Sequence, residues 1–257
     1  MIDTRFKTLR TISALSIREM TTTYGKSAGG YFWAIVEPVF AIALLSFVFE
    51  LVLRSPSIGL NFQIFYATGL LPYAFYNQTA NKVARAVNFS RSLLFYPAVI
   101  YTDAIFARFI VNGLTHLIIF FVIMTGIIYV YDLRVILDVP SIVLALSMTA
   151  VLGLGIGVLN CFLFAYVPFW DVVWTVLNRP LFILSTVIYA FEDVPVLFRE
   201  YLWYNPLIHI VGASRRGFYS TYEATYVEPM YVFGIGLGCL CVGLLLLNLF
   251  VRDILNR

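Results

Sequence analysis

Long apolar stretches separated by short polar segments dominate the pattern of hydrophobic and polar positions along the chain. The apolar runs at residues 31–53, 109–131, 141–167 and 229–251 each exceed the roughly 20 residues that a helix needs to cross a hydrocarbon core. A fifth run, at residues 62–80, is shorter and becomes polar at its far end. We expect all five runs to span a membrane.

A sixth span is predicted at residues 172–191, although this run contains Arg179 and Pro180. The 12 residues from Pro180 to the end of the run would make about 18 Å of helix, which is too short for a hydrocarbon core of about 30 Å. The crossing must therefore include Arg179. The predicted fold class is an all-α membrane protein with six transmembrane helices in a single domain over residues 1–257.

Three further segments flank or join these spans. Residues 3–27, within a cytosolic segment 1–30, are polar and basic with apolar residues near helical spacing, which is typical of an amphipathic helix lying along the membrane surface. Residues 81–108 combine basic side chains with the apolar run SLLFYPAVIY, so this loop is either a docking surface or packed against its own spans. Residues 192–228 form a long, partly apolar connection, which predicts short helices that re-enter the membrane from the outer side.

Composition and charge agree with a membrane protein. Hydrophobic residues make up 61% of the chain, charged residues make up 12%, and the mean hydropathy is +0.89. The polar start of the chain has no continuous apolar core, so we expect no cleaved signal peptide. Twelve of the 17 Lys and Arg residues fall in segments that a cytosolic N-terminus would place in the cytosol. Both termini are therefore predicted to be cytosolic, and the net charge of +3 gives no reason to expect nucleic-acid binding.

Polar residues inside the spans are the first candidates for a functional site, because a membrane interior makes them costly. Glu37, His116, Asn160 and Arg179 all fall about 9–11 Å from the cytosolic ends of their spans. They are predicted to form a polar layer around a central pathway, with Glu37 and Arg179 as an ion pair. The alternative is an internal salt bridge that only permits a helix containing proline.

Aromatic and small residues give a weaker indication. Aromatic residues near the span ends either form interfacial belts or offer stacking faces to sugar rings; these are Trp33, Tyr66, Phe75, Tyr76, Trp170 and Trp174. The 153–157 and 234–238 segments each contain a GxxxG spacing, which predicts close helix packing. The three cysteines lie inside apolar runs without metal-ligand spacing, so we expect neither a metal site nor a disulfide framework.

Gly25-Lys26-Ser27 superficially suggests a nucleotide-binding loop. Such a loop needs a glycine five residues before the Gly-Lys pair, where this chain has Met20, and no strand precedes it. The energy for any transport should therefore come from another polypeptide or from an ion gradient.

Several motifs together resemble a known family, the permease subunits of ABC-2 type polysaccharide exporters, especially those for Gram-negative capsular polysaccharide. The resemblance covers nearly the whole chain. The motifs are Arg18-Glu19, Tyr24, Ser27, Gly30-Tyr31-x-Trp33, Glu37-Pro38, Gly69-Leu70-Leu71-Pro72, Asn178-Arg179-Pro180, Asn205-Pro206 and Arg215-Arg216-Gly217-Phe218.

This resemblance implies an ABC-2, type V exporter-like homodimer in the bacterial inner membrane, joined to two separate ATPase subunits that carry ATP and Mg²⁺. The chain itself would bind no cofactor and would catalyse no reaction. It would move a lipid-linked glycan, which periplasmic and outer-membrane export proteins would then receive. The substrate pathway is assigned to Trp33, Glu37, Tyr66, Arg91, His116, Asn160, Trp170, Trp174 and Arg179, with Arg91 and Arg179 as a cationic entrance for acidic sugars.

The resemblance also implies that the N-terminal helix and the first cytosolic loop contact the ATPase, and that a re-entrant segment precedes the last span. Contact with the ATPase is assigned to Arg10, Arg18, Glu19, Lys26, Arg91, Phe95 and Tyr96. The extracytoplasmic gate is assigned to Tyr204, Asn205, Pro206, His209, Arg215 and Arg216.

Three alternatives to capsule export stay open at this point. An O-antigen permease would share nearly all of these motifs, and an ABC-2 permease for drugs or smaller lipids would share the architecture. A secondary carrier driven by protons through Glu37 and His116 belongs to a different class, and such carriers often have inverted repeats. We find no convincing internal repeat in this chain.

Overall fold

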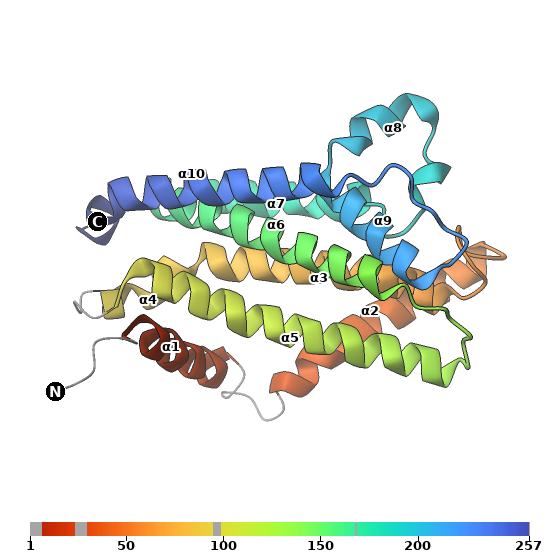
Figure 1. Cartoon of the computed structure of the whole chain (residues 1–257), viewed down its shortest axis with the longest axis horizontal. Helices are drawn as coiled ribbons and strands as arrows, with labels where there is room; N and C mark the ends of the chain where they lie inside the picture. Colours follow the sequence, from red (N-terminus) through yellow and green to blue (C-terminus); the bar gives the residue numbers. More distant parts are fainter. Residues whose placement is uncertain (1–6, 24–29, 95–98, 168, 257) are drawn as a thin grey trace.

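The computed structural model describes residues 7–23, 30–94, 99–167 and 169–256, and all regular structure within these ranges is helical. Most of the helices run along one bundle axis (Figure 1). Their bounds are α1 Lys7–Thr23, α2 Gly30–Val52, α3 Phe62–Ala84, α4 Ala86–Leu94, α5 Tyr101–Val130, α6 Val139–Tyr166, α7 Trp170–Leu184, the short 3₁₀ helix η2 Phe191–Asp193, α8 Val196–Trp203, α9 Pro206–Phe218 and α10 Pro229–Asn256.

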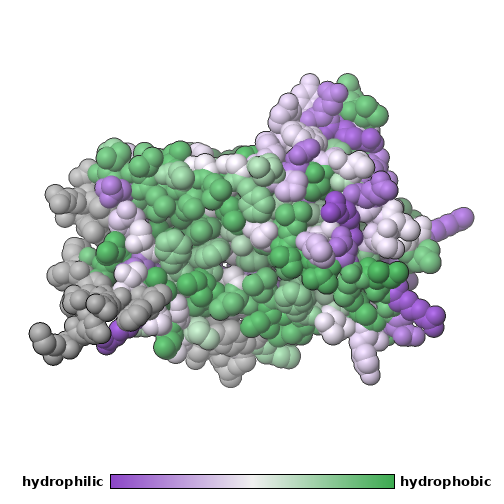
Figure 2. All heavy atoms as spheres, in the orientation of Figure 1, coloured by the Kyte–Doolittle hydropathy of each residue, from purple (hydrophilic) through white to green (hydrophobic). Residues whose placement is uncertain are grey.

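The two ends of the bundle differ. Helix α1, α4 and the end of α10 lie at one end, hereafter the α1 end, whereas α8 and α9 lie toward the other, hereafter the α8 end (Figure 1). Hydrophobic side chains cover the middle of the visible face, and hydrophilic ones gather at the α8 end (Figure 2). The first and the last described helices, α1 and α10, thus have an end at the same end of the bundle.

Within the described residues, four helices are long and apolar enough to cross a membrane, namely α5, α6, and the segments Phe32–Val52 of α2 and Pro229–Phe250 of α10. They coincide with the four longest predicted spans. Helix α3 covers the predicted fifth span and continues four residues further to Ala84. Helix α5 begins at Tyr101, earlier than predicted, so part of the expected loop 81–108 belongs to this helix.

The predicted sixth span is only partly helical. Helix α7 has 15 residues, about 22 Å of helix at 1.5 Å per residue, and it ends at Leu184 instead of residue 191. Thr186 then adopts a positive φ of 56°, and the following segment leaves the helix. Arg215 of α9 donates hydrogen bonds to the carbonyls of Val187 and Tyr189, which provides partners for backbone groups that the helix no longer satisfies.

Close packing around α3 and α6 forms the core of the bundle. Helix α3 packs against α5, α6 and α9, and α6 also packs against α10. A Cβ added at Gly155 would overlap the backbone of Gly236, so these two glycines permit the close approach of α6 and α10. Gly234 and Gly238 have no atom within 4 Å of an added Cβ, so only the central glycine of the second predicted motif lies in this helix contact.

The segments predicted outside the spans are also ordered by packing. Helix α1 packs against α5. Helix α4 buries Ala86, Val87 and Ser90 while Arg91 is exposed, so the loop 81–108 both packs on the spans and presents a surface. Helices α8 and α9 belong to the segment of the chain that joins α7 to α10. Helix α9 packs against α3 and α6 with nearly all of its residues buried, whereas no residue of α8 is buried.

Candidate functional site

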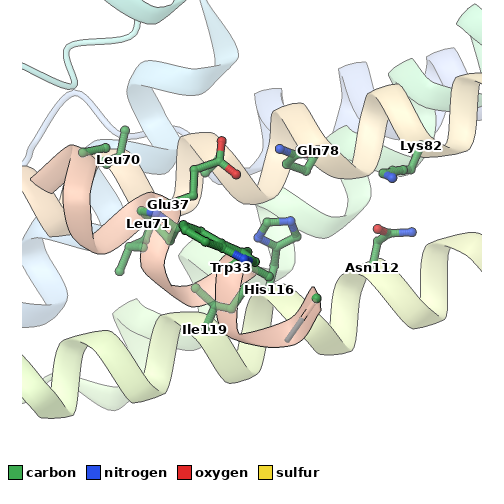
Figure 3. Close-up of a pocket in the computed structure, with 14 residues that line it drawn as sticks. Trp33, Glu37, Leu70, Leu71, Gln78, Lys82, Asn112, His116 and Ile119 are labelled. Carbon is green, nitrogen blue, oxygen red and sulfur yellow. The ribbon is translucent and has the colours of Figure 1, made fainter. Parts of the chain in front are cut away.

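A polar cavity of about 340 Å³ lies between α2, α3 and α5. Figure 3 shows the side chains from the three helices converging on this space. The apolar part of its wall includes Leu70, Leu71 and Ile119. The polar and aromatic part consists of Trp33 and Glu37 from α2, Gln78 and Lys82 from α3, and Asn112 and His116 from α5.

The helical repeat explains why these six side chains meet. Each helix contributes two residues that are four positions apart, and such residues lie on the same face of a helix, one turn from each other. On α5, the Asn112 side chain donates to the Arg108 carbonyl at 2.8 Å. The ring of His116 stacks on Phe75 with a centroid distance of 5.8 Å. These contacts fix both α5 side chains at the cavity wall.

A second cavity of about 770 Å³ lies at the α1 end and shares Gln78 and Lys82 with the first. Its other lining residues are Thr22, Asn81, Arg85, Asn88, Phe89, Arg108, Phe164 and Asp171. Three cations and one carboxylate line this space. Arg85 and Asp171 pair at 2.8 Å, and both are about half exposed, so we expect the pair to contribute little stability. Arg108 pairs with Glu19 of α1, so within the described residues Lys82 is the lining cation without an ion pair. Its charge favours an anionic ligand.

Beside this second cavity, Arg108 joins four helices. Its Nε donates to Glu19 Oε2 of α1 at 3.2 Å, and its Nη1 donates to the Lys82 carbonyl of α3 at 2.9 Å. Its guanidinium lies 4.1 Å from the ring centroid of Phe89 in α4. The Glu19–Arg108 ion pair is nearly buried. We call Glu19, Arg108, Phe89 and the Lys82 carbonyl the Arg108 junction.

The structure brings together only two of the four residues of the predicted polar layer. Glu37 and His116 line the same cavity, but Asn160 is buried elsewhere and accepts a hydrogen bond from Trp170 Nε1 at 2.8 Å. Arg179 is exposed on α7 and lines neither cavity. No ion pair joins Glu37 to Arg179, both of which lie in the described part of the chain. The prediction used only the depth of each residue along its span. In the structure the four side chains point in different directions around their helices and contact different neighbours.

The predicted aromatic pathway residues also separate. Trp33 is exposed at the first cavity. Tyr66 is buried against Phe49, Phe62 and Phe65 at the α8 end of α3, so it is a core residue and cannot contact a substrate in this conformation.

Trp170 and Trp174 act as hydrogen-bond donors between helices. Trp170 binds Asn160 of α6, and Trp174 Nε1 donates to Asn81 Oδ1 of α3 at 3.2 Å. Arg91, which was assigned to both the pathway and the ATPase contact, is exposed on α4 and lines neither cavity.

Of the residues assigned to the ATPase contact, Lys26, Phe95 and Tyr96 lie outside the described residues. Arg10 is exposed on α1. Arg18 lies 5.2 Å from the ring centroid of Phe89. Glu19 is buried in the Arg108 junction, so it is not accessible for a direct contact with another subunit.

The residues assigned to the gate divide into buried anchors and exposed groups. Asn205 caps α9 by accepting from the Leu207 amide at 3.1 Å, and Pro206 follows as the first residue of that helix. Tyr204 is exposed, and Arg216 is exposed next to Ser141 and Asp138, with its Nε donating to Ser141 Oγ at 2.9 Å.

His209 is fully buried, and its two ring nitrogens have different roles. Its Nδ1 accepts from the Glu228 amide at 3.1 Å, so the proton lies on Nε2, which donates to the Trp203 carbonyl at 2.9 Å. Burial lowers the pKa of His209, which keeps the ring neutral. This residue therefore ties α8, α9 and the start of α10 together.

Arg215, which the resemblance assigned to the extracytoplasmic gate, is fully buried as well. Besides its bonds to the Val187 and Tyr189 carbonyls, its guanidinium lies 4.2 Å from the ring centroid of Phe65. Gate residues such as Arg215 and His209 thus hold the α8 end together and do not face an open passage.

These features define an integral membrane protein of the permease class, with a cationic, aromatic-lined cavity system at the α1 end of a helical bundle. The chain belongs to the ABC-2 type transporter family, whose family model matches residues 10–219. It is the membrane permease subunit and not the ATPase, and a permease of this class implies an ATPase partner.

Similar proteins extend over nearly the whole chain. The chain is 28% identical over 236 residues to the polysialic acid transport protein KpsM of Escherichia coli, with 92% of each chain covered. It is 26% identical over 246 residues to the capsule polysaccharide export inner-membrane protein CtrC of Neisseria meningitidis serogroup A / serotype 4A, which covers 95% of this chain and 92% of that relative. The O-antigen export system permease protein RfbA of Klebsiella pneumoniae is 23% identical over 245 residues, with 90% and 88% covered.

Proposed function

We propose that this chain is the permease subunit of an ATP-driven exporter that moves lipid-linked capsular polysaccharide across the bacterial inner membrane. Its similarity to proteins named for capsule export extends over nearly their full length. In this proposal two copies of the chain assemble with two ATPase subunits, which bind ATP and Mg²⁺. Periplasmic and outer-membrane proteins then take the glycan onward.

The α1 end faces the cytosol in this proposal. Lys82, Arg85, Arg91 and Arg108 lie toward this end of the bundle, as the bias of basic residues toward the cytosol requires. The six crossings are α2, α3, α5, α6, α7 and α10. Because α7 is too short to cross alone, residues 185–190 complete its crossing, and the buried helix α9 covers their polar backbone.

The observation that carries the proposal is that the two cavities are neighbours and share Gln78 and Lys82 in their walls. In the proposed route, a substrate passes these two side chains on its way from the cytosolic end to the side of the bundle between α2, α3 and α5. An anionic sugar or the phosphate of a lipid anchor would bind first at Lys82, which lines both cavities. The exposed ring of Trp33 then offers a stacking face at the first cavity.

The Arg108 junction would transmit the motion of the ATPase to this route. Helices α1 and α4 present the exposed surface at the cytosolic end, and both contact Arg108 or its neighbours. Movement of α1 would displace Arg108 and, through the Lys82 carbonyl, the part of α3 that lines both cavities. Glu19 is a link inside the permease in this scheme and not a contact to the ATPase.

The test is surface polysaccharide in cells whose own copy of the gene is replaced by variants. Lys82→Ala removes the cation shared by both cavities but leaves the backbone carbonyl that binds Arg108. We expect this variant to lose at least nine-tenths of export, and Lys82→Arg to keep most of it. A tenfold loss corresponds to about 1.4 kcal/mol of interaction between the Lys82 cation and the substrate. Wild-type export by Lys82→Ala, with the ATPase still co-purifying, would refute the proposed route. Loss of O-antigen with intact capsule would assign the chain to the O-antigen exporters.

A further inference from the structure

An open groove of about 390 Å³ lies at the α8 end, away from the two cavities described above. Its lining consists of Phe191, Val196, Arg199, Glu200, Trp203 and Tyr204. Val196, Arg199, Glu200 and Trp203 lie at helical spacing on one face of α8, and Tyr204, the C-cap residue in a helical backbone conformation, continues this face. We call this the α8 groove. Its volume falls within the range of about 300–1,000 Å³ that is usual for small-molecule sites.

A second layer of aromatic residues holds the walls of the α8 groove in place. Trp203 donates its indole N–H to the Tyr226 carbonyl at 3.1 Å and stacks on Tyr231 with a centroid distance of 5.1 Å. Phe191 packs on the ring of Tyr226 at 4.2 Å. Burial raises the pKa of Tyr226 to about 12, so its hydroxyl stays neutral. These contacts hold two of the aromatic walls, Trp203 and Phe191, in place before any ligand arrives, which reduces the entropy that binding would cost.

Arg199 supplies a fixed positive charge to this groove. Its Nη2 donates to the carbonyls of Glu192 and Val194, at 2.7 and 2.9 Å, and its guanidinium lies 5.8 Å from the centroid of Phe191. Its Nε is buried and has no hydrogen-bond partner in the part of the chain that the structure describes. A ligand cannot reach this buried Nε, but Nη1 donates no hydrogen bond within the described residues and is the donor that a ligand could use. Glu200 adds a carboxylate, which can accept from hydroxyl groups.

Aromatic faces together with one cation and one carboxylate match the chemistry of a sugar ring that carries an acid group. We propose that the α8 groove binds a saccharide unit of the exported glycan, with its ring stacked on Tyr204 beside Trp203, whose plane is nearly perpendicular to that of Tyr204, and with its carboxylate at Arg199. A lipid chain fits this lining poorly, because it would desolvate Arg199 and Glu200 without pairing them. This inference rests on the proposed function and adds an outward-facing glycan subsite.

Helix α8 contains its own control. Tyr204 lines the groove and is 67% exposed, whereas Tyr201 is 76% exposed on the same helix but does not line it. The Tyr204 carbonyl accepts a hydrogen bond from the Tyr231 hydroxyl, and replacement of the Tyr204 side chain keeps this carbonyl. Tyr204→Ala and Tyr201→Ala therefore remove the same side chain from different faces of one helix.

The experiment is calorimetric titration of the full-length protein in nanodiscs with an α2,8-linked sialic acid tetramer, and with maltotetraose as a neutral probe. We expect the acidic tetramer to bind more tightly than the neutral one. Tyr204→Ala should weaken this binding about fivefold, from the loss of one aromatic face, and Tyr201→Ala should leave it unchanged. Arg199→Gln should abolish the preference for the acidic tetramer, provided that its melting temperature matches that of the wild type.

Equal weakening by Tyr204→Ala and Tyr201→Ala, or no binding of either probe, would overturn the α8 groove as a saccharide site. If Arg199→Gln unfolds α8, the tyrosine pair alone decides the result. The proposed function fails by a different observation, which is normal surface polysaccharide after deletion of the gene. Polysaccharide lost on deletion, with no binding at the groove, would leave the exporter intact and remove only the subsite.

Discussion

Replacement of Glu19 with Gln should detach α1 from the bundle without unfolding the remaining helices. The Glu19 and Arg108 side chains are only 4% and 8% exposed, so the charge left on Arg108 would be poorly screened by water. Removal of one partner of a buried pair costs about 3–5 kcal/mol. Arg108 keeps the Lys82 carbonyl and the Phe89 ring, so we expect the lower value, about 3 kcal/mol.

Hydrogen exchange in nanodiscs measures this cost directly. A loss of about 3 kcal/mol in the docking of α1 should speed exchange of its amides about 100-fold, while amides of α6 keep their rates. Ser13→Ala is a matched control, because Ser13 is exposed on α1 and its hydroxyl donates to the Arg10 carbonyl of the same helix. Unchanged exchange of α1 in Glu19→Gln would refute the argument that the buried pair holds this helix.

Transport by the same variant separates coupling from folding. In the complex with its ATPase, Glu19→Gln should continue to hydrolyse ATP while export of polysaccharide falls, because the force on α1 no longer reaches α3. A parallel fall in ATP hydrolysis, export and the amount of assembled complex would instead indicate misassembly, and the coupling role of the Arg108 junction would be wrong.

Three further variants test the packing. Gly155→Ala should lower the melting temperature, because its Cβ would overlap Gly236 and overpacking costs about 1–3 kcal/mol, whereas Gly238→Ala on α10 should not. Arg215→Ala should speed exchange of residues 185–190 by removing the donor to two of their carbonyls; equal exchange in both proteins would contradict this. Burial lowers the pKa of His209 below its unfolded value of 6.5, so the neutral ring contributes its full stability above pH 6.5. This contribution should be lost as the pH falls through the lowered pKa, because a protonated Nδ1 can no longer accept the hydrogen bond from the Glu228 amide. His209→Gln should lose this pH dependence.

Periodicity and length predicted the long helices because these signals are local. The spans at 31–53, 109–131, 141–167 and 229–251 needed only a count of apolar residues, and the structure confirms them. The end of α7 could not be predicted in the same way. It depends on Arg215, which supplies donors from α9 to carbonyls after Leu184, and a contact between distant segments leaves no local pattern in one sequence.

The candidate site shows the same division. Depth along each span grouped Glu37 and His116, which line one cavity in the structure. It also grouped them with Asn160 and Arg179, which lie elsewhere, since depth does not say which way a helix faces. The cavity residues Gln78, Lys82 and Asn112 were missed as site residues. A search for polar or aromatic pairs four positions apart would have found one pair on each of α2, α3 and α5.

Lys82 links the Arg108 junction to the proposed substrate route, because its backbone takes part in the junction and its side chain lines the route. Its carbonyl accepts from Arg108, which is held by Glu19 of α1, and its side chain lines both cavities. A displacement of α1 therefore moves a cation within the proposed route without any intervening flexible segment. Since packed helices shift as units and do not deform continuously, a small movement at the α1 end would change both the width of the route and the position of its charge.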